Sequence, residues 1–336
     1  MTTSSGQNPS MGSLFGGDAN DGAGQKTGWL NLPTATLGQS QDIDIAVLGI
    51  GAATPYPVGS YCMDAPDAIR GARSWPNILD QHDFDLYGLT PSAGVLPEGV
   101  TAADFGNLDV VDSAAPQDTA QNRDRIKKAI QSLIASQSIP FVFGGDDSVP
   151  IPVLSAYEGA DQPISILQID AHIDWRDDVN NEKNGLSSNM RRASEMDHIG
   201  KIVQLGARGI GSARAADLQD ALDYGTSFHT TRMLKESGGI DRALADLPED
   251  IPVYVALDID SLDPVLMPAV IGAAQGGLDY DHMMAIFEGI AKRAPIVGFN
   301  LVELMPGRDV NNQGALMASR VAISMLGLIA KQHSQL

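Results

Sequence analysis

Short apolar runs alternate with amphipathic stretches along the chain from residue 43 onward. Strands are predicted for the apolar runs Ile43–Ile50, Ile139–Phe143, Ile164–Ile169, Ile202–Leu205, Val253–Leu257 and Ile296–Leu301. Amphipathic helices are predicted over Thr119–Ser136, Ala213–Tyr224, Tyr280–Lys292 and Gly314–Ile329. Strands that alternate with helices are typical of βαβ units. We therefore predict a three-layer α/β fold, in which helices cover both faces of a mainly parallel central sheet.

The first 28 residues are rich in Gly, Ser, Asn and Asp and offer little apolar surface to bury. This composition predicts a disordered or extended tail. An arm that reaches a neighbouring subunit is the alternative, and Leu14 and Phe15 would then provide its apolar contacts. Residues 29–336 contain neither an internal linker nor a repeat of roughly 20 to 50 residues. This part of the chain is therefore predicted to form a single domain.

Composition and charge narrow the classes of partner. The chain has 336 residues, of which 43% are hydrophobic, and its 22 Lys and Arg against 42 Asp and Glu give a formal net charge of −20. Such a charge opposes binding to nucleic acid and anionic membranes and favours cationic ligands. The single cysteine, Cys62, excludes an internal disulfide framework and fits a reducing compartment. We recognise neither a secretory signal nor an uncharged apolar stretch of about 20 residues, and we predict a cytoplasmic location.

Aspartates gather at the ends of three predicted strands, in Gly144–Ser148, Asp170–Asp174 and Asp258–Pro264. Alternate residues of an extended segment point to the same face. In a parallel sheet, ligands bind beyond the carboxyl ends of the strands. Clustered carboxylates there either take up protons or bind cations. We therefore predict a site for two divalent metal ions, formed by Asp147, Asp170, His172, Asp174, Asp258 and Asp260.

These motifs resemble those of the ureohydrolases, the family that includes arginase and agmatinase. Asp170–Asp174 and Asp258–Pro264 look like the two central metal motifs of that family. Weaker matches follow the expected order at Ala65–Arg70, Asp104–Val110 and Gly276–Leu278. Glu303 lies where the family places a carboxylate that binds the substrate guanidinium. The resemblance covers most of the chain, from about residue 43 to residue 330.

The resemblance implies an arginase-like fold with a binuclear centre of Mn²⁺ or Ni²⁺. In this family a hydroxide that bridges the two ions attacks the guanidinium carbon, and an amine leaves. Two divalent ions lower the pKa of a bridging water, so that hydroxide forms near neutral pH. Asp174 would ligate and hold that hydroxide, while Glu303 would orient the cationic substrate. Because ureohydrolases usually form trimers or hexamers, an oligomer is also implied.

The proposed ligand set and the proton path depart from the family pattern. Asp147 stands where the family has His, so five Asp and one His would hold the ions. This oxygen-rich set favours Mn²⁺, although it does not exclude Ni²⁺. The segment Gly185–Met190 lacks the His that commonly shuttles a proton to the leaving amine. Ser187 or Ser188 could only relay a proton through water, because a hydroxyl has no pKa near 7.

Two further departures concern the substrate pocket. The hydroxyl-rich loop of the family is replaced by Ala269–Gly272, which removes groups that meet the guanidino moiety. Near the N-terminus, Tyr56–Tyr61 replaces the usual arginines and glycines. The pocket is therefore predicted to differ from that of arginase or agmatinase.

Several of these residues also have simpler interpretations. Asp147 could cap the segment that follows it, and Glu303 could form a structural salt bridge with Arg308. Arg176 directly follows the central motif, where the family tends to contact the tail of the substrate.

Arg176 could therefore select a neutral or acidic tail, or it could pair with Asp177 or Asp178. Ser187 is a second candidate for substrate contact. His229 is the histidine that we would test as a substitute proton shuttle.

Two hypotheses follow. The first is a metal-dependent hydrolase of a guanidino or biguanide C–N bond in a substrate other than arginine, similar to metformin hydrolase or guanidine hydrolase. It would release an amine or ammonia and a urea-type product. The second is a non-catalytic ureohydrolase-like subunit that supports an active paralogous chain in a hetero-oligomer. The departures favour the second hypothesis, whereas the retained acidic positions and Glu303 favour the first, which we prefer.

Overall fold

The computed structural model describes residues 28–39, 42–72, 79, 94–112 and 116–335. Within these ranges a single eight-stranded sheet runs through the molecule, in the order β2-β1-β3-β8-β7-β4-β5-β6, and its neighbouring strands pair in parallel. The strands are β1 (Ile45–Ile50), β2 (Ala102–Asn107), β3 (Ile139–Gly144), β4 (Ile164–Ile169), β5 (Ile199–Leu205), β6 (Ser227–His229), β7 (Val253–Asp258) and β8 (Ile296–Val302). The prediction of a mainly parallel α/β sheet is confirmed.

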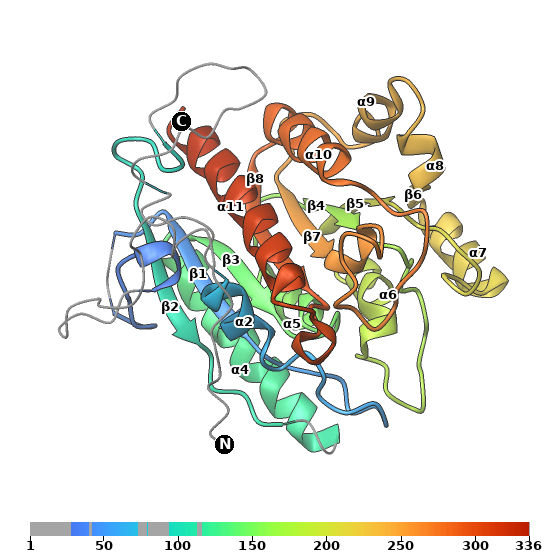
Figure 1. The fold of residues 1–336 in the computed structure, drawn as a ribbon, viewed down its shortest axis with the longest axis horizontal. Coiled ribbons are helices and arrows are strands. Elements are labelled where there is room, and N and C mark those ends of the chain that lie inside the picture. Colours follow the sequence, from blue (N-terminus) through green and yellow to red (C-terminus); the bar gives the residue numbers. More distant parts are fainter. Residues whose placement is uncertain (1–27, 40–41, 73–78, 80–93, 113–115, 336) are drawn as a thin grey trace, which may run out of the picture.

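Helices cover both faces of this sheet (Figure 1). One face packs against α2 (Ala65–Gly71), α8 (Thr231–Leu234), α9 (Gly239–Leu244), α10 (Tyr280–Arg293) and α11 (Gln313–His333). The other face packs against α4 (Pro116–Ala135), α5 (Pro150–Ser155), α6 (Asn189–Ser194) and α7 (Ala215–Tyr224). Short 3₁₀ helices span Trp29–Asn31, Leu186–Ser188, Ile259–Ser261 and Pro306–Arg308. The fold therefore has the three layers that the sequence predicts.

The central strands are apolar in continuous runs because both of their faces are buried. In β3, Phe141 and Phe143 point to the side of α10 and α11, whereas Val142 points to the side of α4 and α5. Trp29, the second described residue, packs against both phenylalanine rings at centroid distances of 6.1 and 4.9 Å. The predicted tail of residues 1–28 lies, apart from Gly28, outside the described residues.

Helix α11 is long and apolar, and it lies beside α10 on the same face of the sheet (Figure 1). By length and composition alone it is able to cross a membrane, but 72% of its most apolar window is buried inside the protein. One such helix is weak evidence for a membrane span, because the core helix of a globular protein has the same character.

The sequence pattern missed elements that are short or lie at an edge. The edge strand β2 reads AADFGN and has no apolar run, since its last residues are exposed. The opposite edge strand, β6, has 3 residues. The helices α2, α5, α6, α8 and α9 have between 4 and 7 residues, too few to show a helical period.

The strand order brings the acidic clusters together. Strands β3, β8, β7 and β4 are neighbours at the centre of the sheet, although they lie far apart along the chain. Because the strands are parallel, their carboxyl ends lie at the same edge. The segments that follow these four strands therefore meet at one place.

Candidate metal centre

Four neighbouring strands end in acidic residues that converge at one edge of the sheet. Asp170 directly follows β4, Asp258 is the last residue of β7, Glu303 directly follows β8, and Asp147 follows β3 by three residues. All four side chains are buried. A cavity of about 170 Å³ opens onto this cluster. Of the predicted site residues, the following line it: Asp147, His172, Asp174, Arg176, Ser187, Asp258, Asp260 and Glu303.

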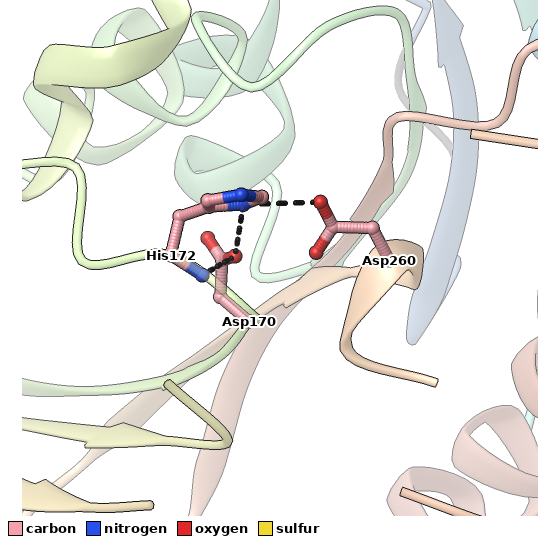
Figure 2. Close-up of side chains that lie close together, drawn as sticks. All are labelled: Asp170, His172 and Asp260. Carbon is pink, nitrogen blue, oxygen red and sulfur yellow. Dashed lines mark hydrogen bonds and ion pairs between the residues drawn. The ribbon is translucent and has the colours of Figure 1, made fainter. Parts of the chain in front are cut away.

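Asp170, His172 and Asp260 form one group of facing donor atoms (Figure 2). The Nδ1 atom of His172 lies 3.1 Å from Oδ2 of Asp260 and 3.5 Å from Oδ1 of Asp170. Backbone groups hold both carboxylates, because the amide of His172 donates to Asp170 (2.6 Å) and that of Ala171 donates to Asp260 (3.2 Å). One imidazole nitrogen and two carboxylate oxygens therefore point to the same spot, as the ligands of a divalent cation do.

Asp147, Asp170 and Asp258 form a second group, in which the three ligand atoms lie within 4.8 Å of one another. Asp170 thus belongs to both groups. The backbone amide of Asp260 donates to Asp258 (2.7 Å), and the side-chain amide of Asn189 donates to Asp147. Asp174 belongs to neither group but interacts electrostatically with Asp147 and lines the same cavity. Two adjacent groups with a shared carboxylate have the arrangement of a binuclear site.

The charges of the cluster require compensation. Burial and the neighbouring carboxylates raise the pKa values of Asp147, Asp174, Asp258 and Asp260. Burial opposes ionisation of His172, but its hydrogen bonds and ion pairs with Asp170 and Asp260 outweigh burial and raise its pKa to about 12. Without cations these shifts favour the protonated forms, and divalent ions would displace the protons. The donor set, made of carboxylate oxygens and one imidazole, fits two divalent cations.

Glu303 is anchored beside the cluster. Its Oε1 atom accepts a hydrogen bond from the backbone amide of Asp147 (2.9 Å), and the Tyr61 hydroxyl donates to both carboxylate oxygens at 3.0 and 2.9 Å. Burial, followed by the charge of Asp146, raises the pKa of Glu303 to about 8. The carboxylate therefore has a fixed position at the cavity wall, and the partners that hold it within the described chain, Tyr61 and the amide of Asp147, carry no positive charge.

The backbone is strained at two of the proposed catalytic residues. Asp174 has φ of 50° and Glu303 has φ of 69°, in the left-handed region that non-glycine residues rarely adopt. Such conformations persist where the surrounding structure imposes them, and they cluster at functional sites. At Glu303 the backbone amide donates to the carbonyl of Gly145 (2.9 Å), which ties β8 to the loop after β3.

The cavity walls combine apolar and charged residues. Ile173, Trp175, Leu186 and Ile271 contribute apolar surface. Asp217, also at the cavity, pairs with Arg176 at 3.3 Å and with Arg214 at 2.7 Å.

The alternative that Arg176 pairs with Asp177 or Asp178 is therefore not what the structure shows, because its ion pair is with Asp217. Asp177 instead pairs with Arg192 at 3.1 Å. Ser187 lies in the wall, where its carbonyl accepts a hydrogen bond from the Arg176 amide (2.9 Å).

The simpler interpretations of Asp147 and Glu303 do not match the contacts of the described residues. The turn before α5 is held by Asp146, which accepts hydrogen bonds from the amide and hydroxyl of Ser148. Asp147 instead faces the cluster. The Arg308 guanidinium donates to the carbonyl of Val270 (3.0 Å), and the contacts of Glu303 are with Tyr61 and Asp147.

His229 lies away from the cavity. It ends β6 at the sheet edge, and its Nε2 atom lies 2.7 Å from Asp246. It is not among the cavity-lining residues of the described chain. A role as substitute proton shuttle therefore gains no support from its position.

Tyr61, Gln168 and Asn189 contact the site although no motif pointed to them. Tyr61 lies in the segment that departs from the ureohydrolase pattern, and this departure was the one available signal. Gln168 donates to Asp170 (2.7 Å) and Asp174 (3.3 Å) from within β4. A polar residue inside a buried strand was the corresponding signal for Gln168, since buried amides require partners.

Comparison with known proteins gives the family and supports the fold. The Arginase family profile matches residues 43–327. Human mitochondrial guanidino acid hydrolase is 27% identical over 90% of this chain and 82% of its own length. Chicken mitochondrial agmatinase is 27% identical over 88% of this chain and 84% of its own. The solved structure of proclavaminate amidino hydrolase from Streptomyces clavuligerus superposes with a TM-score of 0.75 at 22% identity, over 92% of this chain and 99% of that one.

The profile covers most of the chain, so the protein belongs to the arginase family. Members of this family are hydrolases that act on amidino C–N bonds and depend on a binuclear metal centre. The chain is thus a ureohydrolase-type protein whose acidic residues are able to bind metal.

Proposed function

We propose that this protein hydrolyses a C–N bond of a small guanidino or biguanide compound other than arginine, of the metformin or guanidine type. The products would be an amine or ammonia and a urea-type compound. The position of Glu303 is the observation that carries the proposal. This buried carboxylate lies at the wall of the cavity that opens onto the acidic cluster, and no cationic side chain of the described residues pairs with it. A guanidinium group supplies the missing positive charge and the matching hydrogen-bond donors.

We assign the metal ligands to Asp147, Asp170, His172, Asp174, Asp258 and Asp260, which would hold two divalent ions, Mn²⁺ or Ni²⁺. When bound, such ions lower the pKa of water enough to provide a nucleophile at neutral pH. A carboxylate oxygen of Asp174 would accept a hydrogen bond from the attacking water and direct its lone pair at the guanidinium carbon. Asp174 has a left-handed backbone conformation, of the kind that clusters at functional sites.

Glu303 would bind two N–H groups of the guanidinium and hold its carbon toward the acidic cluster. Tyr61 and the amide of Asp147 anchor the carboxylate, which also lines the cavity where the substrate would bind. A proton must also reach the leaving amine. Ser187 in the wall would pass it through water, since a hydroxyl has no suitable pKa of its own.

The tail of the substrate would meet Arg176 and the apolar side chains of Trp175, Leu186 and Ile271. The charge of Arg176 is partly neutralised by Asp217, which argues for a small neutral tail over a strongly charged one. The apolar wall at Ile271 fits the same choice. Among the relatives, guanidino acid hydrolase and agmatinase are named for substrates other than arginine.

Location and assembly stay predictions. We predict a cytoplasmic protein, although some relatives are named as mitochondrial. A homo-oligomer, or a hetero-oligomer with a paralogous subunit, is expected from the family. The comparisons give no support to the alternative that this chain is a non-catalytic subunit.

The test is Glu303→Gln, assayed with a panel of guanidino and biguanide compounds after loading with Mn²⁺ or Ni²⁺. Loss of one charge-assisted contact in the transition state costs a few kcal/mol, so turnover should fall roughly a hundredfold or more. Metal content and oligomeric state should not change. Glu236→Gln, at an exposed side chain, is the matched control. Turnover that survives Glu303→Gln would remove the proposed role of Glu303, and a loaded chain that is active only with a paralogous partner would favour the non-catalytic alternative.

A further inference from the structure

A buried line of hydrogen bonds runs from the cavity wall to the metal-ligand candidates. The indole Nε1 of Trp175 donates to Oε1 of Gln204 (2.7 Å). The Nε2 of Gln204 donates to Oε1 of Gln168 and to the carbonyl of Ile173 (2.9 Å). The Nε2 of Gln168 then donates to Oδ2 of Asp170 (2.7 Å) and to Oδ2 of Asp174 (3.3 Å). The line therefore ends on two carboxylates of the acidic cluster.

The direction of this line follows from its first member. An indole N–H can only donate, so the oxygen of the Gln204 amide must face Trp175. The NH₂ group of Gln204 then points the other way, where it meets the oxygen of Gln168. The NH₂ group of Gln168 is consequently turned toward the carboxylates. Trp175 thus sets the orientation of both amides.

Burial makes this arrangement rigid. Gln168 and Gln204 face each other across the β4–β5 pair, and each is 1% exposed, while Trp175 is 2% exposed. A buried amide without partners costs several kcal/mol, and here both N–H bonds and the oxygen of each amide have partners. Fully satisfied buried networks of this kind hold their members in one geometry.

The chemistry of Gln168 suits a support for cation ligands. Its single NH₂ group spans two carboxylates that would otherwise repel each other. A Lys or Arg at this place would also bridge them, but its charge would compete with a bound cation. A neutral amide orients the oxygens and leaves their negative charge available.

We infer that Gln168, oriented by Gln204 and Trp175, is a positioning residue that sets the carboxylates of Asp170 and Asp174 for divalent-cation binding. The inference rests on the proposed metal centre. It also assigns Trp175 a second task, since this residue forms the cavity wall and orients the amide line beneath the wall.

The test measures Mn²⁺ binding by isothermal titration of the full chain after removal of metal. Gln168→Met keeps the volume and removes the donor, so the Mn²⁺ dissociation constant should rise about tenfold to a hundredfold, as with other outer-shell partners. Gln204→Met should weaken binding by a smaller factor, because Gln168 remains. The double variant should bind no more weakly than Gln168→Met alone, since Gln204 acts through Gln168.

Gln332→Met is the matched control. Gln332 lies on α11, does not line the cavity, and hydrogen-bonds the amide of Ile296 and the carbonyls of Ala291 and Ala294. The same kind of polar deletion should leave the Mn²⁺ dissociation constant unchanged. Thermal unfolding of each metal-free variant separates loss of fold from loss of cation binding.

The outcomes are distinguishable. If the unmodified chain binds neither Mn²⁺ nor Ni²⁺, the proposed metal centre fails and the inference falls with it. If it binds Mn²⁺ and folded Gln168→Met binds as tightly, the inference is overturned while the metal centre stands. Should Gln168→Met fail to fold, Gln204→Met decides: an unchanged dissociation constant overturns the inference, and a raised one supports it.

Discussion

Removal of the bound cations should reverse the pH dependence of stability. In the metal-free protein, burial and then Asp146 raise the pKa of Glu303 from an ordinary 4.5 to about 8, and Asp147, Asp174 and Asp258 are shifted in the same direction. The folded chain then retains protons that the unfolded chain has released. For an acid whose pKa is raised on folding, the retained proton stabilises the folded state relative to its ionised form. This stabilisation is fully present below the unfolded pKa and is lost as the pH rises through the folded pKa.

The magnitude follows from proton linkage. When the folded state binds one more proton than the unfolded state, the free energy of unfolding falls by about 1.4 kcal/mol for each unit by which the pH rises. Glu303 alone supplies about one such proton between pH 5 and pH 8. His172, whose pKa is raised to about 12, acts in the same direction above its unfolded pKa of about 6.5. With saturating Mn²⁺ the protons are displaced, so that stability should instead rise with pH as protons compete less with the metal.

The assay is urea unfolding at pH 6, 7 and 8, with EDTA or with excess Mn²⁺. Titrating groups outside the acidic cluster contribute equally to the EDTA and the Mn²⁺ measurements. The difference between the two slopes of unfolding free energy against pH therefore reports the acidic cluster. In EDTA, Glu303→Gln should reduce the slope of unfolding free energy against pH by the effect of one proton, about 1.4 kcal/mol per pH unit. Glu236→Gln, at an exposed side chain, should leave the slope unchanged. Slopes of the same sign and size in EDTA and Mn²⁺ would refute the reasoning.

Three further predictions follow from the cluster and the family. Asp260→Asn should lower both metal content and the melting temperature, because folding and metal binding are linked; elemental analysis that finds no stoichiometric metal in the unmodified chain after growth with manganese and nickel would exclude the binuclear site. Asp147→His should tighten metal binding by restoring the ligand set of the resembled family, and a change in neither metal content nor activity would exclude Asp147 as a ligand. Light scattering at micromolar concentration should show an oligomer, and a clean monomer would contradict the predicted assembly.

The sequence predicted the central sheet well and its edges poorly, for a physical reason. Strands such as β4 and β7 are buried on both faces and are therefore continuous apolar runs that stand out in the sequence. The edge strand β2 is partly exposed and contains Asp104, which accepts hydrogen bonds from Arg70 and Trp29. A polar residue that is satisfied by distant partners leaves no local signal of a strand.

The candidate site divides in the same way. Asp170, His172, Asp258 and Asp260 directly follow apolar runs in short motifs, so the sequence was enough to predict that they gather at the ends of strands. The extended geometry from which a shared face was predicted ends at Asp258, because Asp260 lies in the 3₁₀ helix Ile259–Ser261. No local sequence pattern predicted the hydrogen-bond partners of the site residues. Tyr61 is 242 positions from Glu303, and Gln204 is 36 positions from Gln168. For Arg176 the sequence left open a substrate contact or a pairing with Asp177 or Asp178, and the ion pair in the structure is with Asp217 from α7.

By itself, the sequence determined the alternation of strands and helices, the placement of acidic residues at strand ends and the membership in the arginase family, because these depend on local period and short motifs. Only the tertiary structure decided that β8 lies between β3 and β7, which places Glu303 beside Asp147 and Asp258. Strand order depends on the packing of helices over the whole sheet, and no local pattern encodes it. The amide line from Trp175 to Gln168 likewise exists only because β4 and β5 pair in register.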